Sequence, residues 1–410
     1  MKAELKKIAN LTYSKRRKAI KNWFKSLDEE IKKELEKALE DSPHWKTSLT
    51  LKKLIDLYVG YKKFGNYVSE NLYKGFELLE KNKSHDRFKI PLQKGITIYT
   101  LSLAPHKVST YNTCPHAGIC KAICLGDNGR NGNRQMFKRI KRTLLFLKNR
   151  NLFLAKLIEE ILYTIKIAKD KRKDKRLDLD VVFRLNNFSD ILWENIKFRP
   201  VDIFNLEDRY TDLVQFEVLR NLFEGNLDFY RRGGYKYKNE TLANKLKEAY
   251  KVENTNSFPK LNMEEKISIF ELFPDIWFYD YTKHPNRENI PPNYHLTFSY
   301  DKGNAKKEKN YKDNIPKDKN LAVIVSETLK NDLIKNSDWK DKVIDGDEND
   351  CRILDDDKKL ILLSYRKGDL DREYLAKYLK KSENKINPEE EIALTPDEFK
   401  KFSKEIRFIN

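Results

Sequence analysis

The segment Gly95-Ile-Thr-Ile-Tyr-Thr-Leu-Ser-Leu103 is soon followed by Cys114-Pro-His-Ala-Gly-Ile-Cys120-Lys-Ala-Ile-Cys124. The first segment is rich in β-branched and aromatic residues, which predicts a strand. The second gathers three of the four cysteines of the chain. A hydrophobic core does not need three thiols this close together, whereas thiolates are soft donors that favour zinc or iron–sulfur clusters. We therefore expect a strand that leads directly into a metal-binding loop.

The spacing of Cys114, Cys120 and Cys124 is C-x5-C-x3-C, which matches neither the two-pair zinc pattern nor the common ferredoxin runs. Three local cysteines leave one coordination position open, and an open position indicates chemistry rather than a structural role. An iron–sulfur cluster with an open site is the leading hypothesis. Three unliganded cysteines and a closed zinc site are the alternatives. The possible fourth ligands of such a zinc site are His106, His116 and Cys351.

The composition bounds the class of protein. A chain of 410 residues is longer than one typical domain, and 39% hydrophobic with 35% charged residues permits a core beneath a very ionic surface. The net charge of +19 favours DNA or RNA as a partner, although a lysine-rich proteome produces the same excess. No apolar run approaches the roughly 20 residues of a membrane span. Nothing at the start is typical of a secretion signal, so we expect a cytoplasmic protein without a disulfide framework.

The composition and periodicity change along the chain and divide it into three regions. Residues 1–85 have a helical apolar stripe and many basic residues, which predicts an N-terminal helical accessory domain. Residues 95–368 contain the cysteine loop, the expected strands, and an insertion near 226–258 that is rich in Tyr, Lys, Asn and Gly. Residues 369–410 are expected to form a mostly polar helical tail, with Thr395 as a helix N-cap before Pro.

Short apolar segments recur after the first strand, and each ends in polar or charged residues. The expected strands are residues 179–187, 276–282, 294–300, 321–326, 343–344 and 360–365. Helical patterns separate several of them, which implies parallel β/α units. Functional groups at the carboxyl ends of such strands are typical of barrels. We therefore expect an α/β fold, namely a partial (β/α) barrel of about six parallel strands, with an open doubly wound sheet as the alternative.

Four polar residues at expected strand ends are candidates for holding a ligand's amino, hydroxyl or carboxylate group: Asn187, Asp190, Asp280 and Lys283. The alternative for each is a loop cap that only satisfies backbone groups. Since the cysteine loop follows the first strand, it should open onto the same face. The aspartates of residues 345–350 have an incomplete calcium-loop spacing and are better interpreted as an acidic turn.

Three cysteines after the first strand of a partial barrel resemble the radical S-adenosylmethionine superfamily. That resemblance implies an enzyme with a [4Fe–4S] cluster on Cys114, Cys120 and Cys124, and S-adenosylmethionine on the fourth iron. The usual spacing in that superfamily is C-x3-C-x2-C, from which this chain departs. Where the superfamily often has Gly-Gly-Glu at the second strand, this chain has Arg184-Leu-Asn-Asn-Phe-Ser-Asp190.

A closer resemblance, over roughly residues 95–368, is to uncharacterised bacteriophage proteins of the gene-product-88 type. It rests on a block from Thr113-Cys-Pro115 through Arg130 and on Arg184-Leu-Asn186, Ser189-Asp190, Phe278–Lys283 and Tyr294–Ser299. This resemblance suggests a viral origin, and hence a host cytoplasm, but it implies no activity.

The sequence thus leaves two main hypotheses. The first is an iron–sulfur enzyme of radical S-adenosylmethionine type, with a nucleic acid or nucleotide as one candidate substrate. The second is a zinc-stabilised, basic phage protein that binds nucleic acid, in replication or host takeover, without enzymatic activity. An adaptor that binds a host protein is a third reading.

Overall fold

A computed structural model describes most of the chain from residue 77 onward. The described residues are 77–81, 89–106, 108–109, 111–124, 132–173, 180–225, 235–251, 261–285, 287–307, 311, 315–316, 319–365 and 372–405. Most of the N-terminal helical domain expected for residues 1–85 lies outside them.

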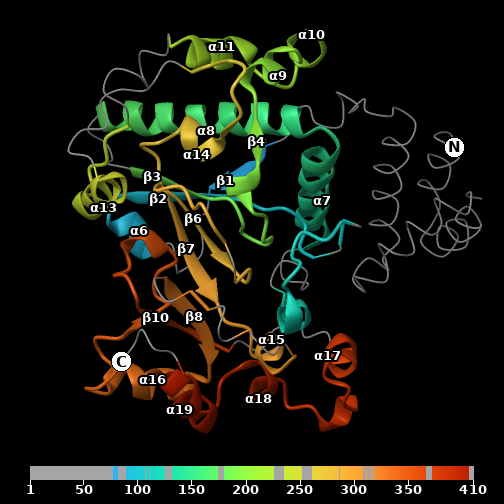
Figure 1. Ribbon diagram of the computed structural model, residues 1–410, viewed down its shortest axis with the longest axis vertical. Helices are drawn as coiled ribbons and strands as arrows, with labels where there is room; N and C mark the ends of the chain where they lie inside the picture. Colours follow the sequence, from blue (N-terminus) through green and yellow to red (C-terminus); the bar gives the residue numbers. More distant parts are fainter. Residues whose placement is uncertain are drawn as a thin grey trace, which may run out of the picture.

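An eight-stranded sheet organises the described residues, in the order β1-β2-β3-β6-β7-β8-β10-β9 (Figure 1). Its strands are β1 (Leu79–Lys81), β2 (Ile96–Leu101), β3 (Asp180–Arg184), β6 (Phe278–Thr282), β7 (Tyr294–Ser299), β8 (Asn320–Val325), β9 (Val343–Asp345) and β10 (Leu360–Ser364). β1 pairs antiparallel with β2, and the other neighbours pair in parallel. No described residues join the edge strands β1 and β9, so the sheet is not a closed barrel.

The mixed α/β fold with parallel strands is confirmed, and every strand expected after residue 95 is present. Seven strands run parallel, close to the expected count of about six, and the expected segment 343–344 joins the sheet as β9. One expectation was wrong in detail. Residues 79–81 form a strand, although they fall in the region expected to be helical, because their backbone pairs with β2.

Helices and short turns connect the strands. The helices are α6 (Lys89–Gln93), α7 (Gly132–Lys148), α8 (Arg150–Lys173), α9 (Pro200–Phe204), α10 (Glu207–Tyr210), α11 (Phe216–Glu224), α13 (Glu240–Tyr250), α14 (Ile269–Leu272), α15 (Lys302–Lys307), α16 (Glu327–Lys335), α17 (Arg372–Leu379), α18 (Pro388–Ile392) and α19 (Pro396–Glu405). The 3-10 turns are η3 (Gly118–Ile123), η5 (Trp193–Asn195), η6 (Arg352–Leu354) and η7 (Glu383–Lys385), and β4 (Lys197–Phe198) pairs with β5 (Ile267–Ser268). Among these helices, none has the length and apolarity that crossing a membrane requires.

Helices cover the sheet on both of its ends and bury two large apolar clusters. Near β1 to β3, α8 lies between the sheet and α9 and α11 (Figure 1). Its apolar residues, Phe153 and Ile161 among them, are therefore buried on more than one side. At the other end, α16 and α19 pack on β8, β9 and β10, where Phe399 and Phe402 join the second cluster. Thr395 and Glu398 cap α19 reciprocally, as expected for an N-cap at Thr395.

The described part of the expected insertion near 226–258 belongs to the core. Tyr235 and Tyr237 are buried, and their hydroxyls bond the two backbone groups of Val181 in β3. α13 follows and buries Leu242. Two tyrosines of this region thus pack against the sheet, and composition alone did not reveal that.

Strand alternation gives the sheet two chemically different faces. The register places Arg184, Tyr281, Ser299, Ile324 and Leu363 on one face, which we call the inner face. Phe183, Phe278 and Asp280 point to the opposite face, where the rings of Phe183 and Phe278 lie 5.7 Å apart in the core. The inner face carries most of the strand side chains that reach the site described next.

Candidate metal centre

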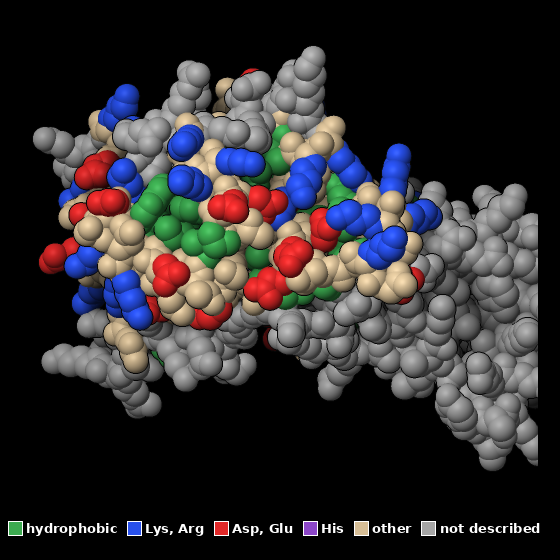
Figure 2. Space-filling model, turned by 90° about the horizontal axis from the view of Figure 1, so that it is seen from below, with side chains coloured by type: hydrophobic (Ala, Val, Ile, Leu, Met, Phe, Trp, Pro, Cys, Tyr) green, Lys and Arg blue, Asp and Glu red, His purple; other side chains and the backbone are tan. Residues whose placement is uncertain are grey.

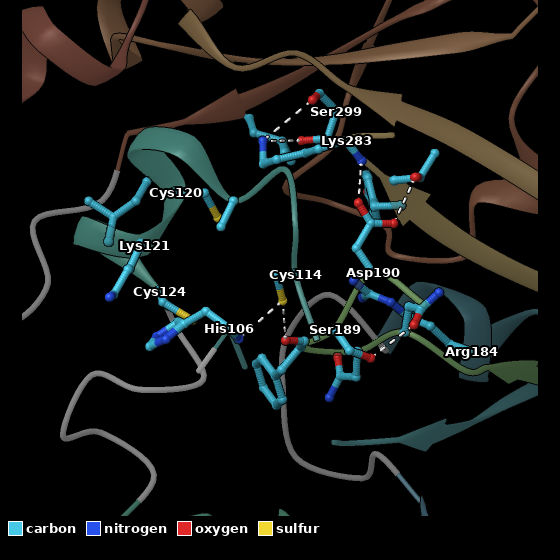
Figure 3. Close-up of a pocket in the computed structure, with 18 of the residues that line it drawn as sticks. His106, Cys114, Cys120, Lys121, Cys124, Arg184, Ser189, Asp190, Lys283 and Ser299 are labelled. Carbon is cyan, nitrogen blue, oxygen red and sulfur yellow. Dashed lines mark hydrogen bonds between the residues drawn. The ribbon is translucent and has the colours of Figure 1, made fainter. Parts of the chain in front are cut away.

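A cavity of about 310 Å³ lies at the carboxyl ends of β3, β6, β7, β8 and β10, beside the cysteine loop (Figure 3). It is lined by His106, Cys114, Ala117, Cys120, Lys121, Ile123, Cys124, Arg184, Asn186, Asn187, Phe188, Ser189, Asp190, Tyr281, Thr282, Lys283, Ser299, Ile324, Asp350 and Leu363. The carboxyl edge of a parallel sheet is where ligands commonly bind in α/β proteins. The three candidate metal ligands and the strand-end side chains therefore share one cavity.

The start of the cysteine loop is fixed to the sheet by hydrogen bonds. The Thr113 hydroxyl donates to the carbonyl of Ala104 at 2.6 Å, and the Asp190 N–H donates to the carbonyl of Thr113 at 2.8 Å. His106 has a left-handed φ of 34°, and its N–H donates to Cys114 Sγ at 3.3 Å. The Cys114 thiol in turn donates to the carbonyl of Phe188 at 3.4 Å. This environment orients one sulfur from two sides.

The second half of the loop is held by the C-terminal part of the chain. The Asn304 amide of α15 donates to the carbonyl of His116, and the Tyr374 hydroxyl of α17 donates to the carbonyl of Gly118, both at 3.1 Å. Gly118 has a φ of 49°, and a Cβ there would lie 2.2 Å from Asn304 Oδ1. Only glycine allows this close approach. The Tyr378 hydroxyl bonds the same Asn304 side chain. We call Asn304, Tyr374 and Tyr378 the loop brace.

Two cysteines of the loop, Cys114 and Cys120, are favoured as thiols by their surroundings. Burial raises the pKa of Cys114 to about 12 and also raises the pKa of Cys120. For Cys120, the carboxylates of Asp301 and Asp190 act in the same direction, while the Lys283 ammonium opposes them. A bound cation would reverse this balance, because a metal ion stabilises thiolates directly. The donor set of three thiols therefore fits a soft metal centre.

The arrangement of the three sulfurs is looser than that of a loaded site. Figure 3 shows the sulfurs of Cys114, Cys120 and Cys124 bordering one open space. None of the four cysteines, all of which are described, is in a disulfide. Within the described part of the chain, no three His, Cys, Asp or Glu side chains already stand as metal ligands do. Metal binding thus requires the loop to draw its sulfurs together.

Three of the four strand-end candidates line the cavity: Asn187, Asp190 and Lys283. Asp190 accepts hydrogen bonds from the Thr282 hydroxyl at 2.7 Å and from the Lys283 N–H at 2.9 Å. The Lys283 ammonium donates to Ser299 Oγ at 3.1 Å. Asn187 bonds the hydroxyl of Ser102 at 3.0 Å. These contacts fix a carboxylate and an ammonium on neighbouring strand ends.

Asp280, the fourth candidate, does not line the cavity. It is fully buried on the opposite face of β6 and accepts from the Asn186 N–H and the Tyr294 hydroxyl, each at 2.6 Å. Burial raises the pKa of Asp280 to about 7. Strand alternation turns residue 280 away from residues 281 and 283, which line the cavity. Asp280 instead holds the backbone after β3 through the Asn186 N–H.

Arg184 and Asp350 line the cavity, although sequence reasoning did not select them. Arg184 Nη1 and Asp350 Oδ2 lie 2.7 Å apart. Asp350 follows β9 in the acidic run expected to be a turn. The other two aspartates of that run, Asp345 and Asp347, pair with Lys330, in keeping with an acidic turn. The signals available for Arg184 were its position at the end of a strand and its place in the Arg184-Leu-Asn186 motif.

The alternative fourth ligands occupy three different environments. His106 lines the cavity, whereas the His116 ring contacts the His284 ring edge-on at 4.6 Å. Cys351 is fully buried in the large core cluster, as expected of an incidental thiol. Only His106 therefore lies at the cavity with the three cysteines.

Comparison with known proteins gives a family. No curated protein and no solved structure matches the chain. A family model described as Gene product 88 matches residues 74–214 and 245–384, which together include every residue that lines the cavity and the loop brace. The match covers more than half of the chain and agrees with the family expected from the sequence motifs. The chain therefore belongs to the gene product 88 family.

Proposed function

We propose that this protein is an iron–sulfur enzyme in which Cys114, Cys120 and Cys124 hold a [4Fe–4S] cluster beside a small-molecule cavity. One observation carries the proposal: three cysteines of one loop line the same cavity as charged side chains from the ends of several parallel strands. A core or a purely structural loop has no need to place thiols, an ammonium and carboxylates around a common space.

The fold supports a likeness to radical S-adenosylmethionine enzymes. From β2 to β8 the parallel strands follow one another in chain order, with only β9 and β10 exchanged, as in a partial (β/α) barrel. The cysteine loop follows the first parallel strand of this series. Three cysteines leave the fourth iron of a cluster for an external ligand, for which we propose S-adenosylmethionine. The bound cluster would supply one-electron chemistry.

The residues of the chain would bind and orient that ligand. The Lys283 ammonium is suited to a carboxylate, and Asp190 is suited to an ammonium group. Ile123 and Phe188 contribute apolar surface that excludes water. The N–H of His106 is directed at the sulfur of Cys114, and hydrogen bonds to cluster sulfurs tune reduction potentials. Asp280 does not contact the ligand in this proposal, but it holds the backbone of Asn186 by accepting its N–H.

The test is metal analysis of protein purified without oxygen. We expect iron and acid-labile sulfide in the wild-type protein and neither in a Cys114→Ser, Cys120→Ser, Cys124→Ser variant. Cys351→Ser is the matched control, because this thiol is buried in the core, and it should keep the full metal content. Protein without bound metal after anaerobic iron and sulfide reconstitution would refute the proposal. Isothermal titration of the reconstituted protein with S-adenosylmethionine tests the ligand separately.

Net charge supports the second candidate, a zinc-stabilised protein that binds nucleic acid. The face in Figure 2 carries many Lys and Arg side chains, but Asp, Glu and apolar side chains lie among them. The excess of +19 is thus not gathered into a uniform basic surface on that face. One equivalent of zinc, together with DNA affinity that falls steeply with salt, would favour this candidate over the iron–sulfur enzyme.

A further inference from the structure

The cavity has a second wall, opposite in character to the cysteine loop. It is formed by Arg184, Tyr281, Ile324, Asp350 and Leu363. Four of these belong to the inner face of the sheet, and Asp350 reaches it from the segment after β9. The metal proposal uses none of them. We call this set the strand wall.

An ion pair at the centre of the strand wall is held rigidly. The side chains of Arg184 and Asp350 are 13% and 6% exposed, and their closest atoms are 2.7 Å apart. The Arg184 guanidinium lies over the Tyr281 ring, 5.0 Å from its centroid. The Tyr279 hydroxyl approaches the same Asp350 oxygen at 3.4 Å. A buried, clamped pair of this kind is preorganised for recognition.

This pair leaves a donor and an acceptor without a hydrogen-bond partner. The contact uses Nη1 of Arg184 and Oδ2 of Asp350. Within the residues that the structure describes, Nη2 of Arg184 and Oδ1 of Asp350 have no hydrogen-bond partner, and the buried Nε of Arg184 also lacks one. A guanidinium N–H donates and a carboxylate oxygen accepts. The complementary ligand edge is a carbonyl beside an N–H.

The charge around the pair disfavours an ionic ligand. Behind it, Arg352 pairs with Asp355 at 3.0 Å, and both side chains are almost fully buried. Each cation of this group is thus matched by a carboxylate, so neither an anion nor a cation would gain a net opposite charge. A neutral group with its own dipole fits better, because it can bond Arg184 Nη2 and Asp350 Oδ1 without adding charge.

The rest of the strand wall is apolar. Ile324 and Leu363 come from neighbouring strands, paired in register, and Tyr281 supplies a ring. Flat apolar surfaces around one polar edge are typical of sites for planar heterocycles. A cavity of about 310 Å³ is also of small-molecule size.

We infer that the strand wall binds a planar, uncharged heterocycle through an amide-like edge, with the carbonyl on Arg184 and the N–H on Asp350. Nucleobases with an N–H beside a carbonyl, such as uracil and guanine, carry this edge, and so does a ring-bound carboxamide. This inference deepens the proposed function, because it names a substrate class for the same cavity.

The experiment is isothermal titration of the full-length protein with uridine and guanosine, and with nicotinamide for the carboxamide source. The matched ligands are 3-methyluridine and 1-methylguanosine, in which a methyl group replaces the N–H of the edge. We expect one of the unmethylated compounds to bind, and a methylated nucleoside to bind at least about 10-fold more weakly than its parent, since a buried acceptor is left unpaired. Binding by nicotinamide alone would assign the edge to a carboxamide.

Two variants separate the site from the fold. Asp350→Asn removes the carboxylate at constant shape, and Leu363→Trp fills the cavity while keeping the ion pair. Both should lose binding, whereas Leu92→Trp, on a side chain that is 49% exposed and outside the cavity lining, should not. Circular dichroism confirms folding. The inference is overturned if none of the three compounds binds, if the methylated nucleosides bind equally well, or if the folded Leu363→Trp variant binds like wild type.

Metal content is measured in the same preparations, so the two proposals can fail separately. Nucleoside binding without metal would remove the iron–sulfur proposal and keep the strand wall. A loaded cluster without binding of any of the three compounds would keep the iron–sulfur proposal and remove the strand-wall inference.

Discussion

Burial raises the pKa of both Cys114 and Cys351 to about 12, although the two thiols lie in very different places. Cys114 lines the cavity, accepts the N–H of His106 and donates to a carbonyl, whereas Cys351 is enclosed by the large core cluster. A raised pKa therefore reports burial, and it is the surroundings that distinguish a candidate ligand from a core thiol.

The largest expected difference between the two cysteines is in metal content. Cys114→Ser should remove most of the bound iron, because two thiolates hold a cluster poorly. Cys351→Ser should leave iron unchanged but lower the free energy of unfolding by about 1 to 3 kcal/mol, since it buries a hydroxyl in the core. Elemental analysis and urea unfolding measure the two effects. Equal iron content in both variants would show that Cys114 is no more a metal ligand than Cys351.

The loop brace should matter next. Gly118→Ala adds a Cβ that collides with Asn304 and strains a backbone with φ of 49°. We expect the free energy of unfolding to fall by about 1 to 2 kcal/mol. Metal affinity should fall about 10-fold or more, because the loop is displaced. The matched control is Gly225→Ala, which adds a Cβ at φ 92° in the C-cap of α11. That variant should lose comparable stability without losing metal affinity. Competition with a chelator measures the affinity.

Removing one hydrogen bond of the brace should have a smaller effect. Tyr374→Phe deletes the bond to the carbonyl of Gly118, worth about 1 kcal/mol, and should speed metal release about 5-fold. Tyr163→Phe, on a side chain that is 64% exposed, should leave the release rate unchanged. Stopped-flow mixing with a chelator follows the rate. Identical rates in both variants would show that α17 does not support the loop.

Asp280 extends the comparison from thiols to carboxyls, because burial raises its pKa from 3.8 to about 7 although it does not line the cavity. The folded protein therefore binds more protons than the unfolded chain between these values. Stability from this group should rise as pH falls from about 7 to about 4, by at most about 1.4 kcal/mol per pH unit. In Asp280→Asn that dependence should disappear, as urea unfolding across this range would show. If the stability of Asp280→Asn depended on pH as that of the wild-type protein does, the dependence could not be assigned to Asp280.

The sequence revealed local features of the site well and distant pairings poorly. The cysteine loop and the polar strand ends were visible because each lies within a short segment. Asp280 was chosen with Lys283 because both end the same strand, but alternation sends them to opposite faces. Arg184 and Asp350 lie 166 positions apart, and only the folded sheet brings them together. β1 was missed because three residues carry too little pattern.

The loop brace also has a consequence for the order in which the chain folds during synthesis. Tyr374 lies 256 positions beyond Gly118, to whose carbonyl it donates. Since synthesis proceeds from the N-terminus, the cysteine loop leaves the ribosome long before the helix that steadies it. Its final shape must wait until Tyr374 has been synthesised. A chain that stops before Tyr374 would thus carry the three thiols without this hydrogen bond to the loop.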